Sequence, residues 1–144
     1  MEKENIRRKI LLNYLISILI IFIFSLSVSQ VLTEDLNYSY VTMIILEGNN
    51  NAYSRGNSFT KPDEIYINGN SQSINPIHNF IQNKNNVTLI WRKNITSCIQ
   101  MFKDCEYVIE IDFTHFDTSQ VTNMLSMFHN CKRLKSLNLS NFDT

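Results

Sequence analysis

The last third of the chain contains one pattern of hydrophobic and polar positions twice in succession. Residues 93–118 and 119–144 align without a gap, so that Phe102 aligns with Phe128. A period of this length is typical of stacked-repeat proteins, in which each unit buries its apolar side against a neighbour. The sequence therefore predicts a solenoid in this region.

Each repeat begins with a spacing that favours a helix. Apolar residues recur at steps of three, four and three, which places them on one face of a short helix. These positions are Ile95, Cys98, Phe102 and Cys105 in the first repeat and Val121, Met124, Phe128 and Cys131 in the second. Thr118 or Ser119 stands where a helix N-cap is expected. We therefore expect one helix at the start of each repeat.

The second half of each repeat changes to the alternation of a strand with one buried face. Ile111 and Phe113 are flanked by polar residues, and so are Leu137 and Leu139. We expect the two strands to be parallel and their polar side chains to form one face, the candidate partner-binding surface. Its residues are Glu110, Asp112, Thr114, Ser136, Asn138 and Ser140.

Written as V-T-x-M-x-x-M-F-x-x-C-x-x-L-x-S-L-x-L-S-x-F-D-T, the second repeat resembles the BspA-like leucine-rich repeat of microbial surface proteins. The similarity covers residues 87–144. The first repeat departs from the pattern at Cys98, where the family has Met, and at Ile109, where it tends to be polar. The resemblance implies a cell-surface solenoid associated with adhesion and with host or matrix binding, and it implies no catalysis.

The fold class that we expect is α/β. It is a leucine-rich-repeat-like solenoid with one helix and one parallel strand per repeat, preceded by a small β module and an N-terminal hydrophobic signal or anchor helix. The expected domains are residues 1–29 as signal peptide or signal anchor, 30–92 as the β module, and 93–144 as two repeats. Because solenoids normally need about three units, the array is expected to be truncated.

The β module is expected from short runs with strand character, at Tyr40–Leu46, Asp63–Ile67, Ser71–Ile74 and Val87–Trp91. Asn68-Gly69 is a strong hairpin-turn signal, because both residues tolerate positive φ. The Asn-rich stretches Asn49–Asn57 and Asn75–Asn86 are interpreted as surface loops. We expect this module to cover the open edge of the first repeat.

Residues 10–28 are almost wholly apolar and follow a basic cluster, with small residues at Ser25, Ser27 and Ser29. This arrangement is typical of a secretory signal peptide. The apolar length also approaches the roughly 20 residues that span a bilayer, so that either cleavage or retention as a membrane anchor is compatible with the pattern. Both alternatives place the rest of the chain outside the cell.

Four N-glycosylation sequons follow the apolar segment, at Asn37, Asn86, Asn94 and Asn138. Together with a signal peptide they fit glycosylation in a secretory pathway. A glycan at Asn138 would stand on the predicted binding face and obstruct it.

The three cysteines, Cys98, Cys105 and Cys131, are too few for a disulfide framework and lack the spacing of a zinc site. We expect them to pack as small apolar residues, although a bridge between Cys105 and Cys131 is the alternative. Asp117 and Asp143 recur in the same turn, where bonding to backbone N–H groups is favoured over a calcium ladder. No cofactor or metal is expected.

The charge balance and the absence of catalytic motifs reduce the number of function classes that the sequence favours. The chain has 13 basic and 13 acidic residues, and beyond residue 29 nine basic residues stand against eleven acidic ones, so nothing predicts nucleic-acid binding. No nucleophile elbow, zinc-protease motif or phosphate loop occurs, and His78, His115 and His129 share no ligand spacing. We expect no enzymatic activity.

The sequence thus predicts a non-enzymatic secreted or membrane-anchored surface protein whose repeats recognise an extracellular protein or glycan. Residues 10–28 would contact the membrane if the signal is not cleaved. The alternative is a structural cell-surface or wall component made of self-associating repeats, without a specific ligand.

Overall fold

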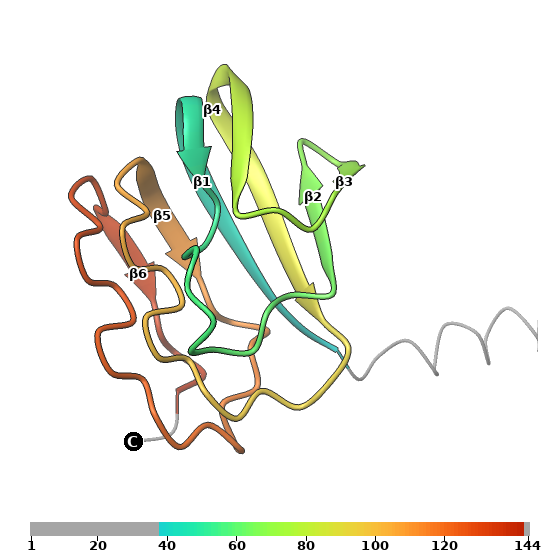
Figure 1. The fold of residues 1–144 in the computed structure, drawn as a ribbon, viewed down its shortest axis with the longest axis vertical. Helices are drawn as coiled ribbons and strands as arrows, with labels where there is room; N and C mark the ends of the chain where they lie inside the picture. The colour runs from blue at the N-terminus through green and yellow to red at the C-terminus, as the bar shows by residue number, and fades with distance from the viewer. Residues whose placement is uncertain (1–37, 143–144) are drawn as a thin grey trace, which may run out of the picture. The chain divides into compact units, whose positions relative to one another are not determined.

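A mixed sheet of six strands organises residues 38–142, the part of the chain that the computed structural model describes (Figure 1). The strand order is β3-β2-β4-β1-β5-β6. The strands are β1 (Ser39–Asn51), β2 (Glu64–Ile67), β3 (Asn70–Gln72), β4 (Ile77–Trp91), β5 (Val108–Asp112) and β6 (Ser136–Asn138). The predicted signal or anchor at 1–29 and the sequon at Asn37 lie outside these residues. Among residues 38–142, no helix is long and apolar enough to cross a membrane.

The strands from β1 to β4 form the antiparallel part of the sheet, with β4 between β1 and β2. The predicted turn between β2 and β3 is confirmed, with φ of 51° at Asn68 and 79° at Gly69. Of the two Asn-rich stretches interpreted as loops, Asn49–Asn57 is strand only as far as Asn51, whereas for Asn75–Asn86 the interpretation was wrong. The ladder between β1 and β4 continues to the pair Asn51↔Ile77, with a bulge near Gly48, so most of the second stretch is strand.

The two repeats contribute the parallel strand pair of the sheet. Strands β5 and β6 pair in parallel, with Ile111 opposite Leu137 and Asp112 opposite Asn138, a constant offset of one full repeat. This confirms the predicted register between the copies. On its other side β5 pairs antiparallel with β1, so the β module and the repeats share one sheet.

The helix expected in each repeat is absent, which overturns the predicted helix-plus-strand solenoid. Residues 38–142 contain no helix, and Thr118 and Ser119 therefore cap none. In place of the helices lie two series of tight turns, which we call the turn segments of repeat 1 (95–107) and repeat 2 (121–133). In Figure 1 they run side by side as two stepped strips.

Each turn segment is closed by hydrogen bonds from a backbone N–H to the carbonyl three residues earlier, as from Cys105 to Phe102 and from Cys131 to Phe128. Left-handed residues interrupt the coil at equivalent places, namely Gln100 (φ 56°), Asp104 (φ 62°), Ser126 (φ 54°) and Asn130 (φ 62°). A right-handed helix cannot pass through such residues. The apolar residues spaced three and four apart still face the core, because each turn directs one apolar side chain toward it.

The turn segments also bond to each other. Four N–H groups of repeat 1 donate to carbonyls of repeat 2, each with an N···O distance of 2.9 Å. The pairs are Cys98 to Asn123, Gln100 to Leu125, Phe102 to Met127, and Asp104 to His129. An α-helix would direct these N–H groups to carbonyls four residues earlier in its own chain. The donors are therefore satisfied by the neighbouring coil instead of by a helix.

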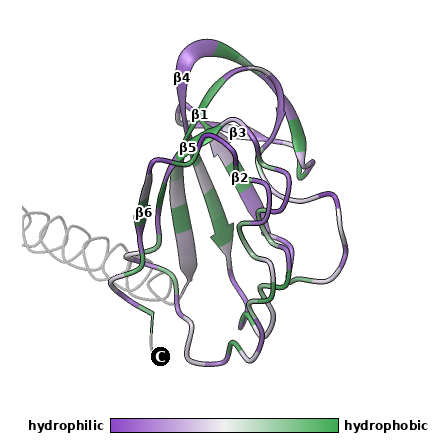
Figure 2. Ribbon diagram, turned by 90° about the vertical axis from the view of Figure 1, so that its left-hand side faces the viewer, coloured by the Kyte–Doolittle hydropathy of each residue, from purple (hydrophilic) through white to green (hydrophobic). Residues whose placement is uncertain are grey.

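The core lies between the inner face of the sheet and the turn segments. Figure 2 shows hydrophobic and hydrophilic bands alternating along the strands, as expected for a sheet buried on one side. Trp91 on β4 packs edge to face against Phe116, with ring centroids 5.3 Å apart. Phe102 and Phe128 stack at 6.0 Å and an interplanar angle of 5°. Equivalent aromatic residues of the two repeats thus lie one above the other.

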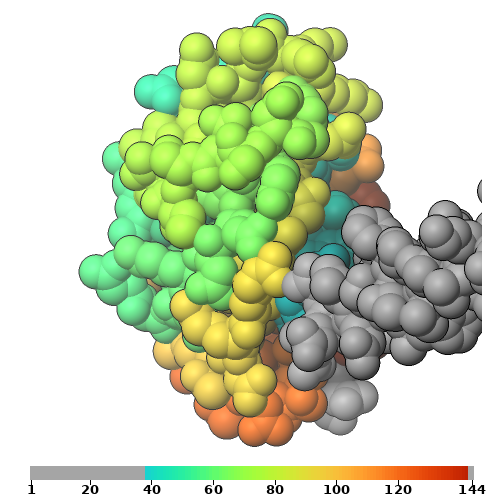
Figure 3. All heavy atoms as spheres, turned by 90° about the vertical axis from the view of Figure 1, so that its right-hand side faces the viewer, coloured from blue at the N-terminus to red at the C-terminus, as the bar shows by residue number. Residues whose placement is uncertain are grey.

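The connection between β1 and β2 covers the turn segment of repeat 1. The N–H of Ser54 donates to the carbonyl of Met101 (2.8 Å), and the N–H of Thr60 donates to the carbonyl of Ser97 (3.2 Å). This connection and the β2–β3 hairpin form much of the surface in Figure 3. Repeat 1 therefore has a neighbour on both sides, with β1 and this connection on one and repeat 2 on the other.

Candidate functional site

The predicted binding face lies on the outer side of the sheet, opposite the core. Glu110, Asp112, Ser136 and Asn138 are all exposed and line one hollow of about 440 Å³. Thr114 and Ser140 follow the ends of β5 and β6 and do not line it. Four of the six predicted residues thus line the hollow, and Thr114 is hydrogen-bonded to two of them, Asp112 and Asn138.

The hollow continues across β1 and β4, which sequence reasoning did not include. Thr42, Ile44, Asn86 and Thr88 line it from these two strands. Registered pairing puts Tyr66, Thr88, Thr42, Asp112 and Asn138 in one row across five strands. The alternation of Thr88 with buried Val87 and Leu89 shows that Thr88 points outward, but only the pairing shows which strands are neighbours.

Asp112 accepts three hydrogen bonds on this outer face. Its Oδ1 accepts hydrogen bonds from the hydroxyl of Thr114 (2.6 Å), the backbone N–H of Thr114 (2.9 Å) and the side-chain amide of Asn138 (3.0 Å). The bonds from Thr114, followed by the one from Asn138, lower the pKa of Asp112. The carboxylate is therefore charged throughout the neutral range.

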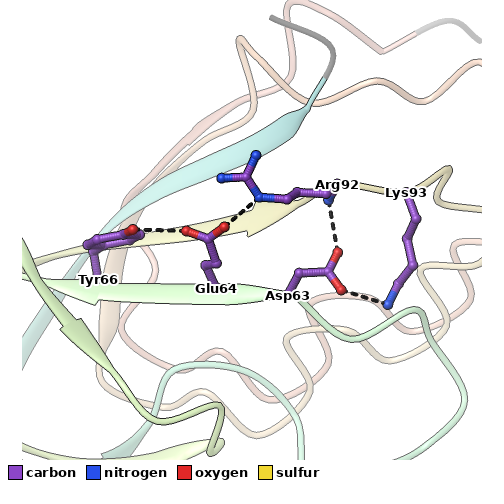
Figure 4. A network of polar contacts seen from close by, with 5 residues as sticks. All are labelled: Asp63, Glu64, Tyr66, Arg92 and Lys93. Carbon is purple, nitrogen blue, oxygen red and sulfur yellow. Dashed lines mark hydrogen bonds and ion pairs between the residues drawn. The ribbon is translucent and has the colours of Figure 1, made fainter. Parts of the chain in front are cut away.

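At the β2 end of the outer face lies a chain of polar contacts (Figure 4). The hydroxyl of Tyr66 donates to Glu64 at 2.8 Å, and Glu64 is also paired with Arg92. The hydrogen bond to Glu64 raises the pKa of Tyr66. Beside it, Asp63 accepts from the N–H of Arg92 and pairs with Lys93 (2.9 Å). Partial burial alone would raise the pKa of Asp63, but these bonds lower it.

The hollow is lined by carboxylate, hydroxyl and amide side chains together with Met43, Ile44, Val87 and Ile111, and by no Lys, Arg or His. Glu110 and Asp112 therefore give it a negative charge that no side chain within the lining balances. Such a surface offers hydrogen bonds to a neutral, hydroxyl-rich ligand and attraction to a cationic one. It would repel an anionic one.

A second, larger hollow of about 530 Å³ lies where β1 ends near the turn segment of repeat 1. Its lining includes both signs of charge, from Arg55, Lys103, Asp104 and Glu106. Asp104 and Glu106 already accept hydrogen bonds from Asn130, at 2.8 and 3.1 Å. We regard the hollow on the outer face as the better candidate because its two charged residues, Glu110 and Asp112, have the same sign.

Three sequons fall within the described residues. Asn86 is exposed and lines the hollow, and Asn94 is exposed between the end of β4 and the turn segment of repeat 1. The amide of Asn138 donates to Asp112 and to Thr114, so a glycan there would have to displace these bonds. Glycosylation at these positions stays a prediction.

The cysteines are all free, and two of them, Cys98 and Cys105, are buried. Burial raises the pKa of Cys98 to about 12 and that of Cys131 to about 11, and it raises the pKa of Cys105 as well. The Sγ of Cys131 lies 3.1 Å from the carbonyl of Phe102. Thiols of this kind are poor nucleophiles, and they fit the interpretation of the cysteines as packing residues.

Asp117 makes the turn hydrogen bond that was expected of it, because its Oδ1 accepts from the backbone N–H of Ser119 at 2.8 Å. The three histidines do not gather. The ring of His115 stacks on that of Tyr40, with the ring centroids 4.5 Å apart. The Nε2 of His78 lies 2.6 Å from the carbonyl oxygen of Asn75, and His129 is exposed.

Comparison with known families gives one match. Residues 70–144, from β3 through both repeats, match the family described as "Mycoplasma protein of unknown function, DUF285". No curated protein and no solved structure matches the chain significantly.

Proposed function

Because the chain belongs to the DUF285 family of Mycoplasma proteins of unknown function, we propose a function from the geometry of the outer face. The protein is a non-enzymatic surface protein that recognises an extracellular partner through the outer side of its sheet. The observation that carries the proposal is the hollow across β4, β1, β5 and β6, in whose lining polar side chains outnumber apolar ones.

Sheet faces of this kind suit recognition more than chemistry. The row from Tyr66 to Asn138 spans five strands, so a ligand could contact groups held at fixed spacing by the ladder. Adjacent strands are about 4.8 Å apart, which gives a regular array of donors and acceptors. Binding groups on rigid strands lose little conformational entropy when a ligand binds.

The resemblance of residues 87–144 to BspA-like repeats supports a place at the cell surface, and the apolar segment at 10–28 supports export or anchoring. We propose that the described part of the chain faces the outside of the cell. The absence of cations in the lining of the hollow favours a partner that is neutral or positively charged.

The test is binding of the purified full chain to an array that carries neutral glycans, sulfated glycans and extracellular-matrix proteins. We expect binding to neutral glycans or to basic proteins, and not to sulfated glycans. Thr42→Arg places a long cation in the middle of the hollow, and we expect it to weaken binding to a neutral ligand at least about tenfold, or roughly 1.4 kcal/mol.

Gln82→Arg is the matched control, because Gln82 is exposed on β4 and does not line the hollow. Its binding should equal that of the unchanged chain. If nothing on the array binds and the chain instead assembles into ordered polymers, the structural alternative replaces this proposal. Equal loss of binding in both variants would also count against it.

A further inference from the structure

The hollow of about 530 Å³ at the end of β1 takes no part in the recognition proposed for the outer face. One of its walls is the end of β1 with the connection that follows, and the other is the turn segment of repeat 1. Its volume lies within the range of small-molecule sites, which is roughly 300–1,000 Å³. Apart from Gly56, every residue of its lining carries a polar or charged group in its side chain. We therefore expect a small, polar ligand.

Hydrogen bonds to the backbone hold the two walls of this hollow in place. The N–H of Ser54 donates to the carbonyl of Met101 at 2.8 Å, and the side-chain amide of Asn51 donates to the carbonyl of Asp104 at 3.4 Å. The side-chain amide of Asn50, which is buried, donates to two carbonyls of the preceding turn of β1, at 3.1 and 3.0 Å. The position of the walls is therefore set by the fold, and a ligand finds the site already formed.

Four charged side chains line the hollow, two of each sign, and they do not pair with one another. They are Arg55, Lys103, Asp104 and Glu106. The ion pairs among residues 38–142 join other partners, and no nitrogen of the two cations lies within 4.0 Å of an oxygen of the two acids. Opposite charges that line one hollow without pairing leave hydrogen-bonding groups of both kinds to a ligand.

The two cations have donors that the described part of the chain does not use. Arg55 donates from Nε to the side-chain oxygen of Asn51 at 3.2 Å, and its two terminal nitrogens donate to no described group. The ammonium group of Lys103 donates to none either. A guanidinium can bond both oxygens of a carboxylate, and an ammonium beside it adds a second positive charge. This part of the lining therefore suits a carboxylate.

The two acids are each bound through one oxygen from the side of repeat 2. The Oδ1 of Asp104 accepts from the amide of Asn130 at 2.8 Å. The Oε1 of Glu106 accepts from the same amide at 3.1 Å and from Lys132 at 2.9 Å. The second oxygen of each carboxylate accepts from no group within residues 38–142. The carboxylates are thus held in place, and each keeps one oxygen for an ammonium group.

The mixture of charges selects among ligands. An anion or a cation would meet two charges of its own sign, and a neutral ligand would cover the charged groups without pairing them. A ligand with one charge of each sign avoids both costs. The side-chain amides of Asn49, Asn51 and Gln100 complete the lining. Because an amide has a donor and an acceptor, it is complementary to a peptide bond.

We propose that this hollow binds a short peptide with free ends. The carboxylate of the peptide lies against Arg55 and Lys103, and its ammonium group lies against Asp104 and Glu106. The amides of the lining bond to the peptide groups between the two ends. This site is separate from the hollow on the outer face, so either proposal can fail alone.

The probe is trialanine with both ends free, added to the full chain while backbone amide signals are followed by NMR. We expect saturable shifts at Arg55, Gly56 and Lys103. Acetylating the amino end or amidating the carboxyl end removes one charge, and each change should weaken binding at least about tenfold. Free alanine should bind more weakly than trialanine, because it has no peptide bond. Shifts that are absent or confined to the outer face would overturn the inference, and so would equal binding of the capped peptides or of alanine.

Two variants test which side chains hold which end of the peptide. Arg55→Gln should weaken the binding of trialanine but not, any further, that of the amidated peptide. Asp104→Asn should weaken the binding of trialanine but not that of the acetylated peptide, and Asn tolerates the left-handed φ of 62° at this position. Lys84→Gln removes a cation from an exposed position of β4 outside the lining, and it should leave binding unchanged. Equal losses for the free and the capped peptides, or a loss with Lys84→Gln, would contradict the assigned contacts.

Discussion

Repeat 1 and repeat 2 have nearly the same pattern and the same backbone, but they differ in burial. Ile111 and Phe113 are 2% and 0% exposed, whereas their equivalents Leu137 and Leu139 are 37% and 39% exposed. Phe102 is fully buried, and Phe128 is only partly so. The turns and the left-handed residues are nevertheless at equivalent positions in both.

The difference shows that the coil geometry follows from the pattern, while the stabilisation comes from the neighbours. Repeat 1 lies between the β module and repeat 2, so its apolar residues are covered from two sides. This is the behaviour expected of stacked repeats, whose stability is largely a sum of interfaces. Three predictions test how far the comparison holds.

The largest effect is expected from truncating the stacked phenylalanines. Phe102→Ala should cost about 3–5 kcal/mol of unfolding free energy, because it leaves a cavity in a closed core. Phe128→Ala should cost roughly half as much, since part of its ring is already exposed. Urea unfolding of the full chain measures both.

Leu125→Ala is the control for this pair, since most of its side chain is exposed, and it should change stability by less than about 0.5 kcal/mol. Equal costs for Phe102 and Phe128 would mean that the exposed side of repeat 2 is covered in solution.

A smaller effect is expected from the Asp112–Asn138 pair. Asn138→Asp removes the amide donor and places a second carboxylate opposite Asp112, so we expect a lower thermal midpoint at pH 7. The loss should shrink below about pH 4, where protonation of one carboxyl removes the repulsion. Thermal scans across pH measure it, and Gln120→Glu, an exposed change of equal charge, should show neither effect.

The unchanged chain, in contrast, should lose stability as the pH falls. Because the pKa of Asp112 is lower in the folded state, its bonds stabilise the fold above the unfolded pKa of about 3.9. That contribution is lost as the pH falls through the folded pKa. The pKa of Asp117 is lowered by its bonds from Ser119, and that of Glu106 by its bond from Lys132, so they act in the same direction. An Asn138→Asp variant that loses stability in parallel with the unchanged chain at low pH would contradict repulsion between the two carboxylates.

The smallest effect concerns reactivity and not stability. Cys105 is buried and its equivalent Cys131 is half-buried, so iodoacetamide near pH 8 should modify Cys131 first. Both reactions should be slow, because burial raises the pKa of each thiol. Mass spectrometry of the intact, folded chain follows the order, and faster labelling of Cys105 would contradict the assigned burial.

Part of the candidate site could be found from the sequence. The alternation around Ile111 and Leu137 identified the outward residues, and the period of the repeat fixed which of them stand side by side. Thr42, Thr88 and Tyr66 were missed as partners in the same face, because a strand pattern does not tell which strand lies beside it. The antiparallel contact of β1 with β5 joins residues far apart in the chain, such as Thr42 and Asp112, and no local signal specifies it.

The helices were predicted wrongly for a related reason. Apolar residues at steps of three and four fit one face of a helix, but they also fit successive tight turns. Asp104 and Asn130 gave a signal that could have been used, since Asp and Asn adopt the left-handed conformation more readily than most residues.

The repeat, the register between its two copies, the inward and outward positions, and the turn at Asn68-Gly69 could all be predicted from the amino-acid pattern. These depend on local spacing and on residues whose backbone preference is strong. The absence of helices from the turn segments, and the single sheet that runs from the hairpin to the last strand, depend on contacts between distant parts of the chain. The physical reason is that each turn-segment N–H could bond within its own coil or to the next one, and only the presence of a neighbouring coil with carbonyls in register makes the second choice available.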